Sequence, residues 1–263
     1  MKIAAVITTY NRASQLERCL WSLFEYGRVT PDIACIVDDG STDHTRAALE
    51  SLAQKYPVKW MRRERAGGWQ SPSIPRNMAI RMTPHRCDML LFLEPEMLLL
   101  KNTLDVLVTR NYVEGGHAFV NASAQGFVNS PFRGDEWCDP DWLFGASQTQ
   151  REFNQTAVRC ALAPRDTVFR IHGYQESFTG WGHDDTSFVE RMVRAGCGMK
   201  YENNARVIHQ WHDPPPMNAE TANANLARMG VLLDTGALAE GADDEWGTDS
   251  GKHRELLLER ASL

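Results

Sequence analysis

The chain lacks the sequence features of membrane-spanning proteins and of cysteine-based zinc proteins. Its most apolar stretch, residues 89–100, is interrupted by Glu94 and Glu96 and is too short to span a bilayer. None of the six cysteines forms a Cys-x-x-Cys pair, which argues against a zinc ribbon or a thioredoxin-type motif. We therefore expect reduced thiols, no transmembrane segment and a cytoplasmic location.

The chain also lacks an excess of positive charge. It has 28 Lys and Arg residues against 34 Asp and Glu residues, and its formal net charge is −6 at pH 7. Broad electrostatic binding to nucleic acid needs clustered basic residues, so this balance argues against it. One local basic patch is present at Arg62, Arg63 and Arg65. No Gly-rich phosphate loop opens the chain, which counts against a nucleotidyltransferase.

Apolar runs alternate with helical patterns, and this alternation predicts an α/β fold. It is typical of βαβ units and of a mostly parallel sheet flanked by helices. Ser14 and Glu17 have the spacing of a capping box at the start of the first helix. The expected strands cover residues 3–9, 33–37, 58–61 and 89–93, and the expected helices cover residues 14–24, 42–55, 76–82, 102–110, 186–195 and 252–261.

Polar residues stand at the ends of three expected strands. Thr8 and Tyr10 mark the end of the first strand, Asp39 follows the second, and Glu94 and Glu96 follow the strand at 89–93. In open α/β sheets, ligands bind at the carboxyl ends of the strands, so we expect these side chains to line one site. The acidic segment after the second strand also fits a plain turn, because Asp and Gly dominate turns.

The segment Gly180-Trp181-Gly182-His183-Asp184-Asp185 places two carboxylates at a glycine-rich bend before a helical pattern. A carboxylate pair beside an aromatic side chain suits a site that binds an acceptor and removes its proton. Two other interpretations are open. One of the aspartates can serve as a helix N-cap, and the tryptophan can be a core residue.

Taken in order, these motifs resemble nucleotide-sugar glycosyltransferases of the family-2 type, which have the GT-A fold. Residues 6–12 and 37–43 are similar to the opening of that family, and residues 75–80 are similar to its Ala-Arg-Asn-x-Gly helix. Residues 180–185 resemble its acceptor and base motif, in the form found in galactosyltransferases and N-acetylgalactosaminyltransferases. The resemblance covers about residues 3–212.

The resemblance implies one GT-A, Rossmann-like domain over residues 1–263. In this division, residues 1–100 form a nucleotide-sugar-binding half and residues 101–233 form an acceptor and catalytic half. Residues 234–263 form an acidic loop and a C-terminal tail.

For the donor, the resemblance implies a nucleotide-diphosphate sugar, most readily a UDP-sugar, bound by Thr8, Tyr10, Asp39, Arg76 and Glu94. The Asp39 carboxylate can accept a hydrogen bond from the imide N–H of uracil, and the Tyr10 ring can stack on the base. Arg76 would meet a phosphate or steady the neighbouring loop, and it also fits an outward-facing helix residue.

For a metal, the resemblance implies a divalent cation, although this chain has Glu94-Pro95-Glu96 where the family has Asp-x-Asp. The second acid, Glu96, corresponds to the family's usual ligand, and His209 or His212 would supply another. Imidazole favours Mn²⁺ over Mg²⁺. Because Glu is longer than Asp, the alternative is a non-catalytic nucleotide-sugar or glycan-binding relative with a degenerate Asp-x-Asp site.

For catalysis, the resemblance implies an inverting single displacement with Asp185 as the general base. Asp184, Trp181 and Gly182 would bind the acceptor. The acceptor hydroxyl can belong to a glycan, a metabolite, a protein or a modified nucleic-acid base, and the sequence leaves this choice open.

Overall fold

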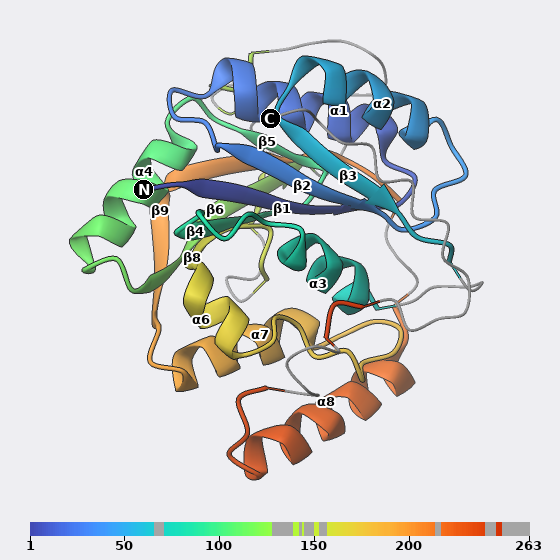
Figure 1. Cartoon of the computed structure of the whole chain (residues 1–263), viewed down its shortest axis with the longest axis vertical. Helices are drawn as coiled ribbons and strands as arrows, with labels where there is room; N and C mark the ends of the chain where they lie inside the picture. Colours follow the sequence, from blue (N-terminus) through green and yellow to red (C-terminus); the bar gives the residue numbers. More distant parts are fainter. Residues whose placement is uncertain are drawn as a thin grey trace.

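The computed structural model describes most of the chain, and Figure 1 shows it in cartoon form. The predicted helix at 252–261 and Cys138 lie outside the described residues. The described residues are 1–65, 71–127, 139–141, 144, 150–152, 157–213, 217–239 and 246–248.

One sheet runs through the centre of the molecule, and nine of its strands are described. Their order is β3-β2-β1-β4-β8-β6-β9-β5, with β7 beside β6. The strands are β1 (Ile3–Thr9), β2 (Ile33–Asp38), β3 (Val58–Arg62), β4 (Met89–Leu93), β5 (Met97–Leu99), β6 (Ala118–Phe127), β7 (Gln150–Glu152), β8 (Cys160–Pro164) and β9 (Gly198–His209).

Helices cover both faces of the sheet (Figure 1). Helices α1 and α2 lie on one face, α3, α6 and α7 lie on the other, and α8 lies beyond α7. The helices are α1 (Ala13–Trp21), continued by the π-helical segment η1 (Ser22–Tyr26), α2 (Thr45–Lys55), α3 (Ser73–Arg81), α4 (Thr103–Val113), α6 (Arg165–Arg170), α7 (Asp184–Arg194) and α8 (Ala219–Asp234).

The predicted α/β class is confirmed, and the parallel part of the sheet lies where the sequence predicts it. Strand β1 pairs in parallel with β2 and β4, and β2 pairs in parallel with β3. Beyond β4 the sheet is mixed, because β8 is antiparallel to both β4 and β6, whereas β6 and β9 are parallel. The carboxyl ends of β1, β2 and β4 therefore meet at one edge.

Residue alternation along the buried strands builds a core on each face of the sheet. In β1, Ile3, Ala5 and Ile7 pack into the cluster that α1 and α2 cover. The intervening Ala4 and Val6 pack into the cluster formed with α3, α6 and α7. Both faces of these strands are apolar, as expected for parallel strands buried under two helical layers.

Several predicted helix boundaries are wrong. Helix α1 begins at Ala13, and its N-cap residue is Arg12, whose side chain makes no capping bond, so Ser14 lies inside the helix and forms no capping box. Helix α3 begins at Ser73 rather than at Arg76, and α7 begins at Asp184 rather than at residue 186. Packing and backbone contacts decide these ends, and hydrophobic periodicity does not resolve them.

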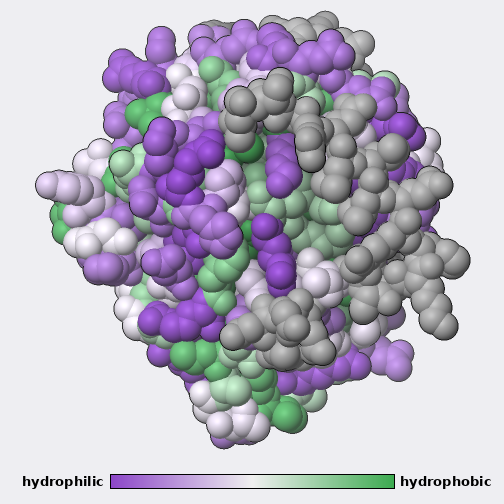
Figure 2. Space-filling view, viewed as in Figure 1, coloured by the Kyte–Doolittle hydropathy of each residue, from purple (hydrophilic) through white to green (hydrophobic). Residues whose placement is uncertain are grey.

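Helix α8 was not predicted from the sequence. The buried Asn225 side chain donates to the backbone oxygens of Thr179 and Gly182 and accepts from the Thr179 N–H. The helix also exposes apolar residues, among them Leu226 and Val231 (45% and 67% exposed). Figure 2 shows apolar colour gathered at the end of the molecule where α8 lies. Because these contacts are polar and long-range, hydrophobic periodicity does not reveal the helix.

The sequence predicts reduced thiols and no transmembrane segment. Within the described part of the chain, Cys19, Cys35, Cys87, Cys160 and Cys197 are free and buried, as expected for reduced thiols. None of the described helices combines the length and apolar character needed to cross a membrane.

Replacing the buried Arg191 should destabilise the fold. Its guanidinium donates to the backbone oxygens of Ile171 and Gly173, each at 2.7 Å. In Arg191→Met both acceptors lose this donor, and we expect the free energy of unfolding to fall by on the order of 3 kcal/mol in urea denaturation.

The matched control is Arg194→Met on the same helix. Arg194 is 42% exposed, pairs with Glu190 at 2.9 Å and donates to the Leu233 backbone oxygen at 2.9 Å. Both contacts are exposed to solvent, so their loss should cost about 1 kcal/mol or less. Equal losses for the two variants would contradict the structural role of Arg191.

Candidate active site

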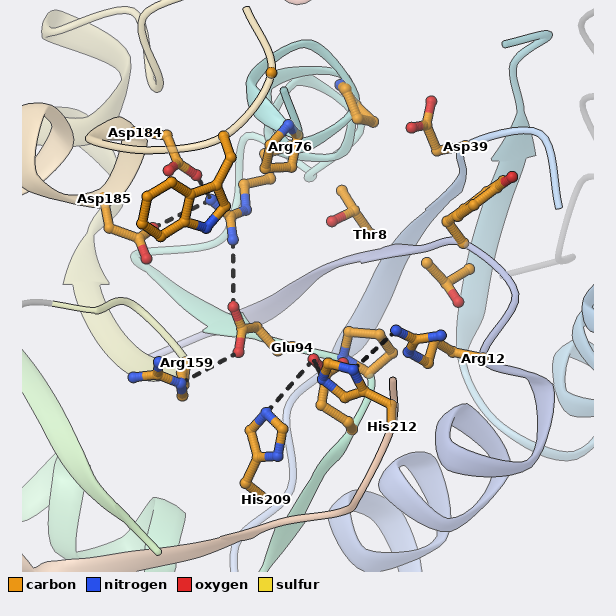
Figure 3. A pocket seen from close by; sticks show the side chains of 18 of the residues that line it. Thr8, Arg12, Asp39, Arg76, Glu94, Arg159, Asp184, Asp185, His209 and His212 are labelled. Carbon is orange, nitrogen blue, oxygen red and sulfur yellow. Dashed lines mark hydrogen bonds and ion pairs between the residues drawn. The ribbon is translucent and has the colours of Figure 1, made fainter. Parts of the chain in front are cut away.

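One pocket of about 320 Å³ opens at the carboxyl edge of β1, β2 and β4 (Figure 3). Every residue that the sequence predicts for the site lines it: Thr8, Tyr10, Asp39, Arg76, Glu94, Glu96, Trp181, Gly182, Asp184, Asp185, His209 and His212. The fold therefore brings all the predicted residues together, from both halves of the chain.

The two acids after β2 have different surroundings. Asp38 is fully buried, accepts from the Ser41 N–H at 2.9 Å and pairs with Arg62 at 2.9 Å, so it stabilises the turn. Asp39 lines the pocket, where its carboxylate is 3.0 Å from Arg63 and 3.8 Å from Arg65. The turn interpretation therefore applies to Asp38, whereas Asp39 faces the space available to a ligand.

An aromatic and arginine corner adjoins Asp39. The Arg65 guanidinium lies over the Tyr10 ring, 4.1 Å from its centroid. The Thr9 hydroxyl is buried and has no hydrogen-bond partner among the described residues. A flat ring, a buried acceptor and a free hydroxyl suit a planar ligand that carries both donors and acceptors.

Glu96, His209 and His212 form a compact group of potential metal ligands. Their ligand atoms all lie within 4.8 Å of one another. Met97 pairs with His209, and the Gln210 N–H donates to the Glu96 backbone oxygen at 2.8 Å. These contacts bring the end of β9 beside Glu96. The sequence left open which histidine belongs to the group, and the structure places both in it.

The protonation of His209 and Glu96 suits metal binding. Although burial lowers the pKa of His212, its hydrogen bond to Glu96 raises that pKa overall, so a metal must compete with a proton there. Burial lowers the pKa of His209 to about 4, so its imidazole is neutral at pH 7. Burial alone would raise the pKa of Glu96, but His212 at 3.1 Å and the nearby His209 and Arg12 lower it to about 2. One carboxylate oxygen and two imidazole nitrogens fit Mn²⁺ or another transition metal better than Mg²⁺.

A chain of alternating charges crosses the other side of the pocket (Figure 3). The Arg76 guanidinium lies 2.5 Å from Asp184, 3.1 Å from Asp185 and 3.4 Å from Glu94. The second oxygen of Glu94 lies 3.8 Å from Arg159. We call these five residues the carboxylate–arginine chain.

The two aspartates occupy the first turn of α7. The position before the helix is His183, and among the described residues no side chain makes a capping bond there, so the N-cap interpretation is wrong. Asp185 also accepts from the Val158 N–H at 3.1 Å. Burial raises the pKa of Asp185, although Arg76 opposes the shift, so this carboxylate is a stronger base than an exposed aspartate.

Asn77, the neighbour of Arg76, fixes α3 relative to the segment before the glycine-rich bend. Its side chain donates to the Tyr174 oxygen at 2.8 Å and to Glu176 at 2.7 Å, and it accepts from the Tyr174 N–H at 2.7 Å. The two neighbouring residues thus have different roles: Arg76 faces the pocket, and Asn77 holds α3 in place.

Trp181 lies at the rim of the pocket and is 37% exposed, so the core interpretation is wrong. Its two glycine neighbours have φ angles of +61° at Gly180 and +109° at Gly182. A Cβ atom would meet Thr221 at 2.9 Å from Gly180 and Ala222 at 3.0 Å from Gly182. Both glycines are therefore required by backbone conformation and by close contact with α8.

Three arginines that were not predicted as site residues also line the pocket: Arg12, Arg65 and Arg159. Arg65 belongs to the basic patch noted in the sequence. The Arg12 guanidinium lies 3.0 Å from the His212 ring. The position of Arg159 depends on the antiparallel pairing of β8 with β4, which no local sequence pattern indicates.

Two segments of the chain match known families. Residues 4–110 match glycosyl transferase family 2, and residues 158–213 match the N-terminal domain of galactosyltransferase. The first part of the chain is thus similar to a family-2 glycosyltransferase domain. Each predicted site residue lies in one of the two matched segments, and the predicted glycosyltransferase class is confirmed at the level of the domain.

Similar proteins agree with this assignment. Chondroitin synthase from Escherichia coli is 24% identical over 264 residues, covering 88% of this chain and 38% of that protein. Validoxylamine A glucosyltransferase from Streptomyces hygroscopicus subsp. jinggangensis is also 24% identical, covering 88% of this chain and 59% of that protein. The chain therefore spans less than two thirds of the length of these relatives.

A solved structure supports the fold. The mannosyltransferase PcManGT from Pyrobaculum calidifontis, in complex with GDP-Man and Mn²⁺, has a TM-score of 0.57 at 17% identity. The match covers 81% of this chain and 57% of that chain. The predicted GT-A fold is thus confirmed.

Removing a member of the metal-ligand group should weaken Mn²⁺ binding. We expect Glu96→Gln, His209→Ala and His212→Ala each to weaken it by about tenfold or more in isothermal titration calorimetry. Exposed His44 lies outside the group, so His44→Ala should bind like the wild type. Wild-type affinity in all three ligand variants would rule out this group as the metal site.

Proposed function

We propose that the protein transfers a sugar from a nucleotide-diphosphate sugar, most readily a UDP-sugar, to an acceptor hydroxyl, with inversion and with Mn²⁺. The observation that carries this proposal is that one pocket brings together the corner of Tyr10, Asp39 and Arg65, a group of potential metal ligands and a buried carboxylate pair. An enzyme that transfers a sugar needs these three parts within reach of one another.

The donor nucleotide would bind at Thr8, Tyr10 and Asp39. Tyr10 stacks on the base, and the Asp39 carboxylate accepts the imide N–H of uracil. Arg65, which lies over Tyr10 and beside Asp39, supplies donors for the carbonyl groups of the same ring. This pairing of one acceptor with nearby donors is the pattern that uracil requires.

Glu96, His209 and His212 would hold the metal. A bound divalent cation offsets the negative charge that develops on the leaving diphosphate. Glu94 and Arg76 complete the donor side, and Arg12 stands behind His212.

Asp185 would act as the general base in a single displacement. It takes the proton from the acceptor O–H, the oxygen forms a bond to the anomeric carbon, and the bond from that carbon to the diphosphate oxygen breaks. The nucleoside diphosphate leaves on the opposite face, so the configuration inverts. Asp184 and the Gly182 backbone would bind acceptor hydroxyls, and Trp181 would stack on the apolar face of a sugar.

The acceptor would be a glycan or a small hydroxyl-bearing metabolite. This choice rests on the names of the relatives, since one makes chondroitin and the other acts on validoxylamine A. A protein side chain or a modified nucleic-acid base presents the same hydroxyl group. A cytoplasmic location, expected from the cysteine pattern, stays a prediction.

The experiment combines binding with turnover. Purified protein is screened by thermal shift against UDP, GDP, CDP and TDP with and without Mn²⁺ or Mg²⁺, because a ligand that binds only the folded state raises its stability. Sugars of the stabilising nucleotide are then tested for release of nucleoside diphosphate. Release of pyrophosphate would instead indicate a nucleotidyltransferase, and binding without turnover would indicate the non-catalytic nucleotide-sugar or glycan-binding alternative.

Asp185→Asn should abolish transfer while leaving the fold and nucleotide binding intact. The amide cannot accept the acceptor proton, and loss of a general base typically costs about 10²–10⁴-fold in rate. Turnover is measured by UDP release, and UDP binding by calorimetry. Asp166→Asn serves as the control because its side chain is fully exposed. Wild-type turnover in Asp185→Asn would exclude it as the base.

The pH profile of kcat/KM should report Asp185. The base must be ionised, so the rate falls as pH drops through its pKa, which burial places above the usual aspartate range. The Arg76 charge lowers this pKa and the Asp184 charge raises it. The acid limb should therefore move to higher pH in Arg76→Met and to lower pH in Asp184→Asn. Shifts in the same direction would contradict this assignment.

A further inference from the structure

Glu94 is oriented toward arginines. One carboxylate oxygen lies 3.4 Å from Arg76, and the other lies 3.8 Å from Arg159. Among the described residues, the group of potential metal ligands contains Glu96, His209 and His212, and Glu94 is not part of it. The two acids of Glu94-Pro95-Glu96 thus face different partners although they are close in sequence.

The sheet topology explains why Glu94 and Arg159 face each other. Strands β4 and β8 are antiparallel, and Leu93 pairs with Cys160. The next residues outward are Glu94 and Arg159, and a hydrogen bond of 2.9 Å from the Glu94 N–H to the Arg159 oxygen joins them. The ion pair therefore closes this end of the strand pair.

The same segment before β8 also holds the proposed base. The Val158 N–H donates to one oxygen of Asp185 at 3.1 Å, and Arg76 contacts the other at 3.1 Å. Arg76 in turn lies between Asp185 and Glu94. A displacement of Glu94 would therefore move the Arg76 guanidinium, which contacts Asp185.

We propose that Glu94, together with Arg159, is a positioning residue that holds Arg76 against Asp184 and Asp185, and that Glu94 is not a metal ligand. This inference rests on the proposed transfer reaction. Glu94 fixes where the Arg76 guanidinium lies, and Arg76 fixes the carboxylate that takes the acceptor proton. Metal binding falls to Glu96 and the two histidines alone.

The length of Glu94 fits this role. Its two oxygens face guanidiniums that come from α3 and from the segment before β8. An aspartate at this position would withdraw the carboxylate by about 1.5 Å, one carbon–carbon bond. Both ion pairs would then lengthen beyond the range of a direct contact. A glutamate stands here in place of the first aspartate of Asp-x-Asp because only the longer side chain reaches both arginines.

The test compares two substitutions that separate charge from reach. Glu94→Gln keeps the length and removes the ionisable carboxyl group, whereas Glu94→Asp keeps the carboxyl group and shortens the side chain. Binding of Mn²⁺ and of UDP is measured by calorimetry, and kcat and the donor KM are measured from sugar transfer. The matched control is Glu50→Gln, which removes a surface partner of Arg46 at 2.9 Å.

A further measurement follows Asp185 without requiring turnover. The full chain is labelled with aspartate carrying ¹³C at its side-chain carboxyl, and the Asp185 signal is identified by its loss in Asp185→Asn. A positioning role predicts that this signal moves in both Glu94 variants and stays in place in Glu50→Gln.

The expected result is a split between binding and turnover. Both Glu94 variants should bind Mn²⁺ like the wild type, while kcat falls by about 10–100-fold because Arg76 and the base are misplaced. Weaker Mn²⁺ binding in Glu94→Gln but not in Glu94→Asp would make Glu94 a ligand and overturn the proposal.

Failure of the transfer reaction itself is a distinct outcome. If the wild type releases no nucleoside diphosphate from any donor, the proposed function is wrong, and the Asp185 signal still tests the link through Arg76. An unmoved signal in both Glu94 variants overturns the positioning role, whether or not the wild type is active. Unchanged kcat in both variants overturns it as well.

Discussion

The site depends on the attraction between one arginine and three carboxylates. Arg76 on α3 contacts Asp184 and Asp185 on α7 and Glu94 after β4, so it joins three segments that are distant in sequence. Without this cation, three acids would share one partly buried space, and their mutual repulsion would be severe. The carboxylate–arginine chain therefore lets Asp184, Asp185 and Glu94 lie close together beside the group of potential metal ligands.

Much of the fold could be predicted because its first part follows simple patterns. Strands such as Ile3–Thr9 and Met89–Leu93 are buried on both faces and are continuous apolar runs, which sequence reveals directly. The second part could not be predicted so well. The pairing of β8 with β4 and β6 is long-range, and α8 is held by polar contacts of Asn225 rather than by an apolar stripe.

The candidate site was more predictable than the second half of the fold. Its residues stand in short ordered motifs, and the resemblance to a family supplied roles that spacing alone does not give. What the sequence could not supply is pairing between distant residues. Arg159 lies opposite Glu94 only because two strands run antiparallel, and the choice between capping and pocket-facing aspartates needed the Arg76 contacts.

The contact between the glycine-rich bend and α8 means that the two sides of the pocket are held in place by different elements of the fold. Tyr10 and Asp39 lie at the ends of the buried strands β1 and β2, whereas the loop that carries Trp181 is fastened by Thr221 and Asn225 of a peripheral helix. Changes in that helix can therefore reshape the mouth of the pocket while leaving Tyr10 and Asp39 in place. Under the proposed function, such changes would alter the choice of acceptor without altering the donor.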